Sequence, residues 1–153
     1  MEAWNPNVRI QNEPFDTGLE TARLTSGRGD IGATVAFTGF CRDEGGRLAA
    51  LELEHYQGMA EREIGRIAGE ARARWPLLGL TIIHRHGRIS PGEPIVLVLA
   101  ASAHRAAAFE AASFLMDYLK TRAPFWKKEH RSDGTEGEWV AAKDTDEAAA
   151  ERW

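Results

Sequence analysis

The chain has 153 residues, of which 43% are hydrophobic and 27% charged, and its formal net charge is −4. This composition is typical of a soluble globular protein long enough to bury one hydrophobic core, and the acidic balance argues against general nucleic-acid binding. The single cysteine, Cys41, excludes an intrachain disulfide and a cysteine-rich metal site.

The start of the chain lacks the marks of a targeting segment. Residues 1–10 have no basic region followed by an apolar run, and no stretch of the sequence reaches membrane-spanning length. We therefore expect one domain over residues 1–153, located in the cytoplasm, with neither a membrane nor a nucleic acid as its partner.

The first third of the chain predicts two strands and a helix, followed by a further strand. Residues 8–11 are a candidate edge strand, and Asp16 is expected to cap a short helix that ends near Gly27. Residues 30–42 are rich in small and β-branched residues, which favours a strand. Residues 47–56 alternate between apolar and charged residues, as in a half-exposed antiparallel strand.

The middle of the chain predicts a second helix and two more strands. Residues 59–75 carry an apolar stripe at helical spacing, and Pro76 ends the helix. Residues 80–86 form a predicted strand, and the almost continuously apolar residues 94–101 predict a central one. Because neighbouring elements are hairpin-like rather than regularly alternating, we expect an α+β fold with packed helices and a mostly antiparallel sheet.

The most informative segment, residues 102–129, predicts a long helix with basic residues at both ends. Ser102 is the expected N-cap, and Pro124 ends the helix because it disfavours helical geometry at the residue before it. The apolar positions repeat at spacings of three and four and are expected to face the core. They are Phe109, Ala112, Met116 and Leu119, widened by Ala108, Ala111, Leu115 and Tyr118.

Cations at the two ends of this helix pose a geometric question. His104 and Arg105 oppose the helix dipole in the first turn, whereas Lys120 and Arg122 suit it in the last. These cations could form either a solvated basic surface or an anion-binding site. Arg105 and Lys120 are about 22 Å apart along a straight helix, at about 1.5 Å per residue, so one small ligand cannot contact both. Either there are two sites, or a second copy of the chain supplies the other end.

The chain after this helix predicts a hairpin and a last helix. Residues 125–128 and 138–140 are expected to pair around a turn at residues 132–134. Asp144 or Thr145 is expected to cap a short final helix.

Lysines and one arginine are the strongest candidates for chemistry. Lys120 and Lys127 flank Phe125 and Trp126, and a lysine in a dry pocket has a lowered pKa that suits proton transfer or nucleophilic attack. The alternative is a pair of solvated lysines beside core aromatics. Arg42 ends a strand, where a guanidinium can grip phosphate, although a plain surface arginine fits the local sequence equally well.

The histidines and the cysteine offer weaker signals. His84 and His86 share a strand face but have no third metal ligand near them in sequence, so we expect no metal site. His55 is expected to be a packed strand residue, and Cys41 a small buried apolar residue. The sequence has no phosphate-binding glycine loop, no G-x-S-x-G and no dinucleotide fingerprint.

Six segments carry a resemblance to a known family: FTGFCR, LEHYQGM, ARARWP, SAHRAAAFEA, MDYLKTRAPFWKKE and the final ERW. In this order and spacing they closely resemble the large, catalytic subunit of molybdopterin synthase, the MoaE family. The similarity covers about residues 32–153 and is most specific in the last third.

The resemblance implies a fold and an activity. The family has an α+β fold with a hammerhead-like substructure and works as a homodimer, each end of which binds a small ubiquitin-like sulfur carrier, giving a heterotetramer. The carrier's C-terminal thiocarboxylate enters a pocket of the large subunit. Two sulfurs pass to cyclic pyranopterin monophosphate, which forms the dithiolene of molybdopterin. No cofactor is implied.

The resemblance also implies roles for residues of this chain. Lys120 and Lys127 match the catalytic lysines. Relatives often carry other residues at Phe40 and Cys41, and the sulfur comes from the carrier, so Cys41 is not expected to be a sulfur donor. The implied substrate-binding residues are Phe40, Cys41, Arg42, His104, Arg105, Lys120, Lys127, Lys128 and Glu129.

Together these arguments predict one pocket shared by two chains. Lys120, Lys127 and Arg42 of one chain are expected to meet His104 and Arg105 of a second copy. Two other functions compete with this one: a non-catalytic adaptor that only docks a ubiquitin-like tail, and a nucleotide or phosphosugar enzyme that uses the same cations. The missing phosphate loop counts against the latter.

Overall fold

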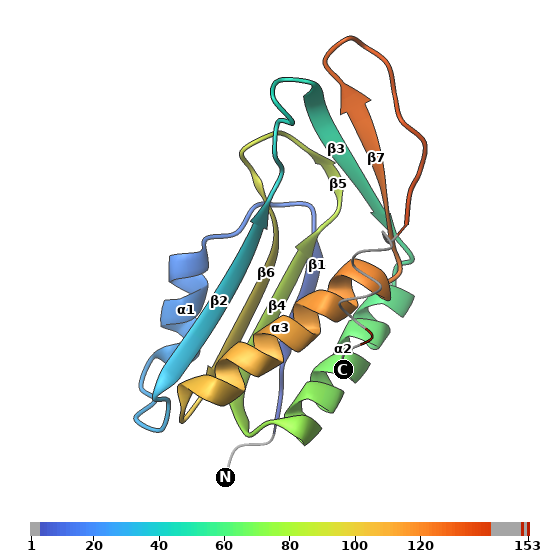
Figure 1. Ribbon diagram of the computed structural model, residues 1–153. Coiled ribbons are helices and arrows are strands. Elements are labelled where there is room, and N and C mark those ends of the chain that lie inside the picture. The colour runs from blue at the N-terminus through green and yellow to red at the C-terminus, as the bar shows by residue number, and fades with distance from the viewer. Residues whose placement is uncertain (1–3, 142–150, 152) are drawn as a thin grey trace.

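The computed structural model describes residues 4–141, 151 and 153, and its larger sheet has four strands in the order β1-β4-β6-β2 (Figure 1). These strands are β1 (Asn7–Gln11), β4 (Leu77–Arg85), β6 (Pro94–Ser102) and β2 (Ala33–Phe40). β1 runs parallel to β4, and the other two pairings are antiparallel. The predicted α+β fold with a mostly antiparallel sheet is confirmed.

A smaller sheet lies beyond one end of the larger one (Figure 1). Its order is β5-β3-β7, formed by β5 (Gly87–Ile89), β3 (Leu48–His55) and β7 (Phe125–Arg131), and both pairings are antiparallel. The predicted hairpin of residues 125–128 with 138–140 is therefore only partly right. β7 pairs along its length with β3, and the later segment adds isolated bridges, one of them from Val140 to Lys127.

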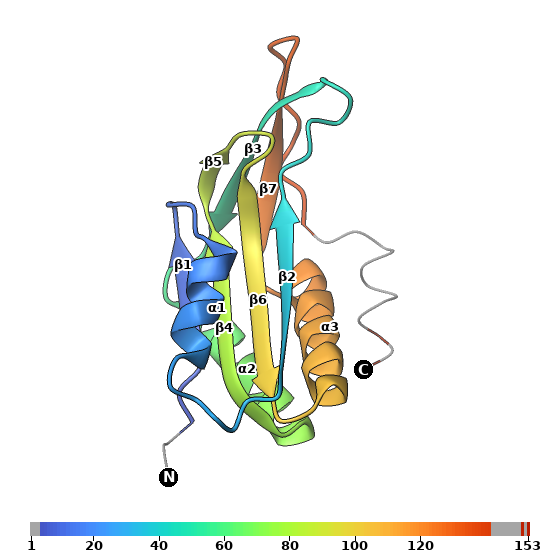
Figure 2. The ribbon, with the colours of Figure 1, turned by 90° about the vertical axis from the view of Figure 1, so that its left-hand side faces the viewer.

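Helices cover both faces of the larger sheet (Figure 2). α2 (Met59–Arg74) and α3 (Arg105–Thr121) lie on one face and α1 (Thr17–Thr25) on the other. Successive residues of β6 point to opposite faces, so Val98 packs with the α2 and α3 side while Leu99 packs towards α1. This explains the continuous apolar run of the central strand. No described helix is long and apolar enough to cross a membrane.

The predicted helix starts are right in one case and wrong in another. Asp16 caps α1 as expected, its carboxylate accepting from the Leu19 N–H at 2.8 Å. Ser102 does not cap α3. It stays in β6, pairing with Ala33 on one side and Leu77 on the other, and its hydroxyl donates to the His104 carbonyl. Sheet pairing thus delays the helix, whose N-cap is His104 without a side-chain cap.

The buried stripe of α3 also differs from the predicted one, because it includes Phe114 and leaves out Phe109. Phe109, expected in the core, is 60% exposed, and Met116 is half-buried. The buried face combines three alanines with four larger side chains. Its buried residues are Ala108, Ala111, Ala112, Phe114, Leu115, Tyr118 and Leu119.

The remaining helix predictions have mixed outcomes. α2 buries the stripe expected of it, and α3 ends at Thr121, before Pro124, as predicted. The predicted caps of the last helix, Asp144 and Thr145, lie outside the described residues.

Candidate functional site

A cavity of about 410 Å³ lies where the C-terminal end of α3 meets the smaller sheet. Most of its lining residues are apolar or aromatic, and lysine, histidine and threonine residues complete the lining. Its lining includes Leu53, Ile95, Met116, Phe125, Trp126 and Val140. Lys120, Lys127 and His84 line the same cavity. A small apolar cavity with a few polar groups is the usual form of a small-molecule site.

The two lysines meet because the chain reverses between them. Lys120 is in the last turn of α3, and a tight turn closed by the Phe125 N–H and the Ala123 carbonyl (2.8 Å) leads into β7. Lys127 is the third residue of β7, opposite Leu53 of β3. Lys120 is exposed and Lys127 is half-buried, and both residues line the cavity.

The segment after β7 borders the cavity beside Lys127. Val140 exchanges two backbone hydrogen bonds with Lys127, of 3.0 and 2.8 Å, and Val140 also lines the cavity. Trp139 is 43% and Val140 50% exposed. An apolar rim is therefore open to a partner at this side of the cavity.

His84 forms part of the cavity wall, which was not predicted from the sequence. Its ring stacks on Phe125 with centroids 3.8 Å apart and planes 15° from parallel. Nδ1 lies 2.9 Å from the Arg85 carbonyl oxygen, which can only accept, so Nδ1 carries the proton and Nε2 is left as an acceptor. A histidine directly after the largely apolar residues 80–83 was the signal in the sequence.

Burial keeps His84 neutral. It lowers the pKa of the imidazole to about 4, and the positive charge of Lys120 adds to the effect. His86 contacts the ring of His55 instead, at 4.8 Å between centroids, and His55 lies 5.9 Å from Phe125. Within the described residues, no three potential ligands from His, Cys, Asp and Glu gather as a metal site would require.

The predicted strand-end residues Phe40, Cys41 and Arg42 do not line the cavity. Cys41 is 3% exposed, burial raises the pKa of its thiol, and it packs against Leu51 and Ile95, which do line the cavity. Cys41 is thus a buried apolar residue, as predicted. Phe40 is 59% exposed, and Arg42 is exposed with its guanidinium 3.5 Å from the Glu44 carboxylate.

The other predicted binding residues are dispersed within one chain. His104 and Arg105 are exposed at the opposite end of α3 from Lys120, so a single chain does not bring them to the cavity. Lys128 lies 2.8 Å from the Glu136 carboxylate, a hydrogen bond that raises the pKa of Lys128. Glu129 is half-buried and pairs with Leu51 in the smaller sheet.

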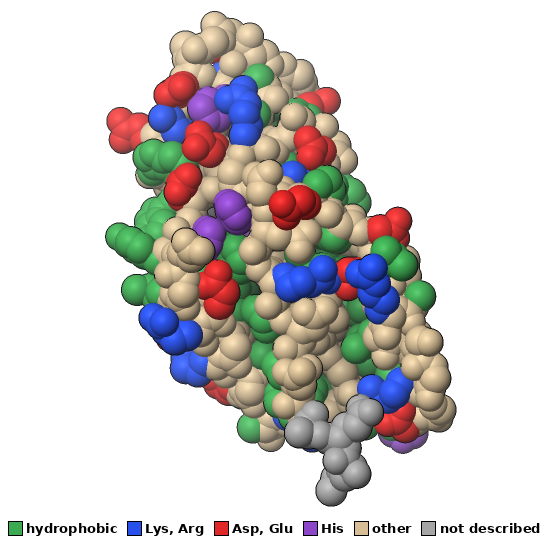
Figure 3. Space-filling model, turned by 180° about the vertical axis from the view of Figure 1, so that it is seen from behind, with side chains coloured by type: hydrophobic (Ala, Val, Ile, Leu, Met, Phe, Trp, Pro, Cys, Tyr) green, Lys and Arg blue, Asp and Glu red, His purple; other side chains and the backbone are tan. Residues whose placement is uncertain are grey.

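Charges of both signs are interspersed on the face seen from behind (Figure 3). Lys and Arg side chains alternate there with Asp and Glu, and this face has no broad basic surface. This mixture of charges is consistent with the net charge of −4.

Comparison with known proteins identifies the family. The model of the MoaE protein family matches residues 10–122. The molybdopterin synthase catalytic subunit of Mesorhizobium japonicum is 72% identical over 148 residues, which cover 97% of this chain and 93% of that protein.

Solved structures of the same family superpose on this chain. The molybdopterin biosynthesis MoaE protein of Burkholderia ambifaria superposes with a TM-score of 0.84 at 48% identity, covering 97% of this chain and 98% of that one. Molybdopterin synthase of Staphylococcus aureus superposes with a TM-score of 0.77 at 31% identity, covering 86% and 95%. The predicted resemblance and the predicted activity, sulfur transfer in molybdopterin synthesis, are confirmed at the level of the family. The chain belongs to the MoaE family of molybdopterin synthase catalytic subunits.

Proposed function

We propose that this chain transfers two sulfur atoms, one per visit, from the C-terminal thiocarboxylate of a small ubiquitin-like carrier to cyclic pyranopterin monophosphate. The observation that carries the proposal is that Lys120 and Lys127 line one cavity, most of whose lining residues are apolar. The volume of about 410 Å³ suits a small ligand, and the stacked rings of Phe125 and His84 offer a flat surface to a pterin.

The lysines would handle the charges that change during transfer. The thiocarboxylate sulfur attacks a carbon of the precursor, and the cyclic phosphate opens as its carbon–oxygen bond breaks. Lys120 or Lys127 donates a proton to the departing oxygen, and the second ammonium stabilises negative charge as it develops. Water then cleaves the acyl–sulfur bond, so that the carrier leaves as a carboxylate and the sulfur stays on the pterin.

The carrier's tail would enter across the apolar rim beside Lys127. Tyr56 packs edge-on against Trp126 at 5.0 Å and is itself 59% exposed, near the exposed Trp139 and Val140. Exposed aromatic and aliphatic groups of this kind mark protein interfaces. The name of the Mesorhizobium relative, a catalytic subunit, supports a further subunit. A reducing compartment such as the cytoplasm suits a thiocarboxylate, because oxidation destroys it.

A homodimer at the centre of a heterotetramer would complete the site. In the described part of the chain β2 is an edge strand, and Phe37 on it is 41% exposed; Phe109 on the neighbouring α3 is 60% exposed. An open edge flanked by phenylalanines favours association with a second copy. We propose that this copy brings His104 and Arg105 to the Lys120 end of α3, where Arg42 also binds the precursor's phosphate and Lys128 and Glu129 complete the binding segment.

The decisive experiment mixes the purified protein with thiocarboxylated carrier and precursor and measures dithiolene formation. Lys120→Ala is expected to lower turnover by at least about 100-fold, because positioned proton transfer contributes on that order. Arg122→Ala is the matched control, since Arg122 is an exposed cation at the same helix end that does not line the cavity. Full turnover by Lys120→Ala would refute the assignment. A protein that binds the carrier but does not bind the precursor would be an adaptor.

Sharing of the pocket is tested separately with a mixed dimer. One chain carries Lys120→Ala and the other His104→Ala, each with its own affinity tag. If the pocket is shared, one site contains both changes and the other none, so about half of the activity remains. If each chain forms its own pocket, both sites carry one change and the activity falls to that of the single variants.

A further inference from the structure

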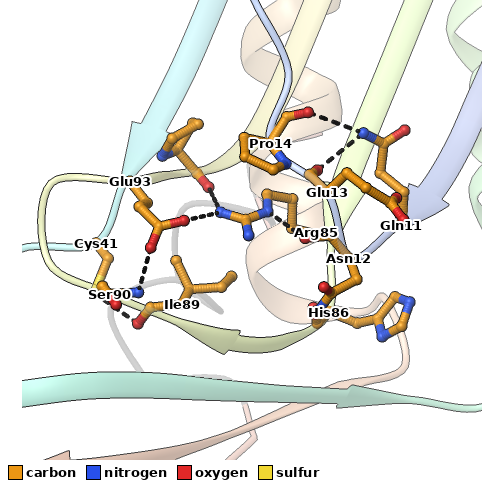
Figure 4. A network of polar contacts seen from close by, with 11 residues as sticks. Gln11, Asn12, Glu13, Pro14, Cys41, Arg85, His86, Ile89, Ser90 and Glu93 are labelled. Atoms are coloured by element: carbon orange, nitrogen blue, oxygen red, sulfur yellow. Dashed lines mark hydrogen bonds and ion pairs between the residues drawn. The ribbon is translucent and has the colours of Figure 1, made fainter.

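Arg85, the last residue of β4, is a charged residue buried where the two sheets meet (Figure 4). Its side chain is 4% exposed. Nε donates to the Asn12 carbonyl at 2.8 Å, and Nη1 donates at 3.0 Å both to the Glu93 carboxylate and to the Pro94 carbonyl. A buried ion pair adds little net stability over an apolar replacement, so stability alone does not account for Arg85.

Glu93 connects Arg85 to the end of β2 through hydrogen bonds. One carboxylate oxygen of Glu93 bonds Arg85, and the other accepts from the Ser90 N–H at 3.1 Å (Figure 4). The Glu93 carbonyl accepts from the Cys41 N–H at 2.9 Å, and the Gly92 N–H donates to the Cys41 carbonyl at 2.7 Å. The backbone of Cys41 is therefore held on both sides by the turn that Arg85 anchors.

Arg42, the next residue, lies between two anchored residues, because the Asp43 carbonyl on its other side accepts from the Leu48 N–H at 3.0 Å. The register of β2 against β6 shifts between Gly39 and Phe40, at the end of the strand. The ion pair between Arg42 and Glu44 spans 3.5 Å with side chains 82% and 42% exposed, and such a pair contributes little. The following loop turns through positive φ angles, 56° at Glu44. The place of Arg42 thus depends on the bonds at Cys41 on the β2 side and on those of Asp43 on the loop side, and only the former lead to Arg85.

Arg85 also contacts a residue of the cavity wall. The Arg85 carbonyl accepts from Nδ1 of His84, which lines the cavity beside Lys120. One residue therefore connects the cavity wall to the strand end that carries Arg42.

We propose that Arg85 is a positioning residue: together with Glu93 it fixes the backbone at Cys41 and so holds Arg42 where it binds the phosphate of the substrate. This inference rests on the proposed function, which assigns phosphate binding to Arg42. A guanidinium is required because its planar fork serves acceptors in three directions, which the single ammonium of a lysine does not reproduce.

The test measures KM for the precursor, kcat and thermal stability of Arg85→Lys with saturating thiocarboxylated carrier. We expect KM to rise on the order of tenfold with kcat within about twofold, since a misplaced binding group weakens substrate positioning. Arg88→Lys is the matched control, because Arg88 is an exposed arginine three residues further along the chain. It should leave KM unchanged.

A double-mutant cycle with Arg42→Ala separates positioning from general stability. If Arg85 acts through Arg42, Arg85→Lys raises KM less than about twofold in the Arg42→Ala background, while the loss of thermal stability is the same in both backgrounds. An equal rise in KM in both backgrounds overturns the inference.

Two further outcomes are distinguishable. If Arg42→Ala raises KM but Arg85→Lys does not, the positioning role is wrong and the proposed function stands. If Arg42→Ala has the wild-type KM, the phosphate-binding assignment fails and this inference with it. Should Arg85→Lys not fold, Glu93→Gln weakens the same contact from its more exposed side, and an unchanged KM for that variant overturns the inference.

Discussion

Protonation of His84 should make the stability of this protein strongly pH-dependent. Its pKa is about 4 in the folded chain, against an ordinary value of 6.5. The unfolded chain therefore binds the proton more readily, and falling pH favours unfolding. The contribution of neutral His84 is complete above pH 6.5 and is lost progressively as the pH falls towards 4.

The size of the effect follows from the two pKa values. One pKa unit corresponds to about 1.4 kcal/mol, and linkage between pH 7 and pH 5 gives a loss of roughly 2 kcal/mol in the free energy of unfolding. The causes of the low pKa are burial first, then the charges of Lys120, His55 and His86. Acidic conditions should thus loosen the cavity wall before the carboxylates titrate.

Urea unfolding of the wild type and of His84→Gln at pH 7 and pH 5 isolates the contribution of His84 to the free energy of unfolding. Glutamine retains a donor for the Arg85 carbonyl but does not titrate in this range. We expect the wild type to lose roughly 2 kcal/mol more than the variant between the two pH values, and other titrating groups cancel in the comparison. Equal losses for both proteins would refute the argument that His84 is buried in its neutral form.

Two further predictions follow from packing. Phe109→Glu should change the free energy of unfolding of the monomer by less than about 0.5 kcal/mol, because Phe109 is exposed, yet sedimentation should show weaker self-association. An unchanged dimer would place the interface elsewhere. Gly32→Ala should destabilise the chain by several kcal/mol in denaturant unfolding, since an added Cβ would collide with the Ala103 carbonyl oxygen, a backbone atom that cannot move aside. Wild-type stability would mean that the β2 start and the β6–α3 connection lie further apart.

Much of the fold is local and was predicted from the sequence. Asp16 caps α1, as predicted, and α3 ends before Pro124, also as predicted. Both predictions succeed because capping and the proline ring act on neighbouring residues. The apolar run of β6 predicted a central strand, and both of its faces are covered. Lys120 and Lys127 were singled out by their interleaving with aromatic residues, and the turn between them brings both to one cavity.

Only the tertiary structure decided which side chains these elements bury. Ser102 has the chemistry of an N-cap, but pairing with strands on both sides keeps it in β6. Phe109 fits a helical stripe by spacing, yet it is 60% exposed because the face that α3 buries is turned away from it. Arg85 and Cys41 are far apart in the sequence, and only the junction of the two sheets connects them through Glu93. Periodicity and capping depend on residues within a few positions of each other, whereas burial and long-range hydrogen bonds depend on whichever segment packs opposite.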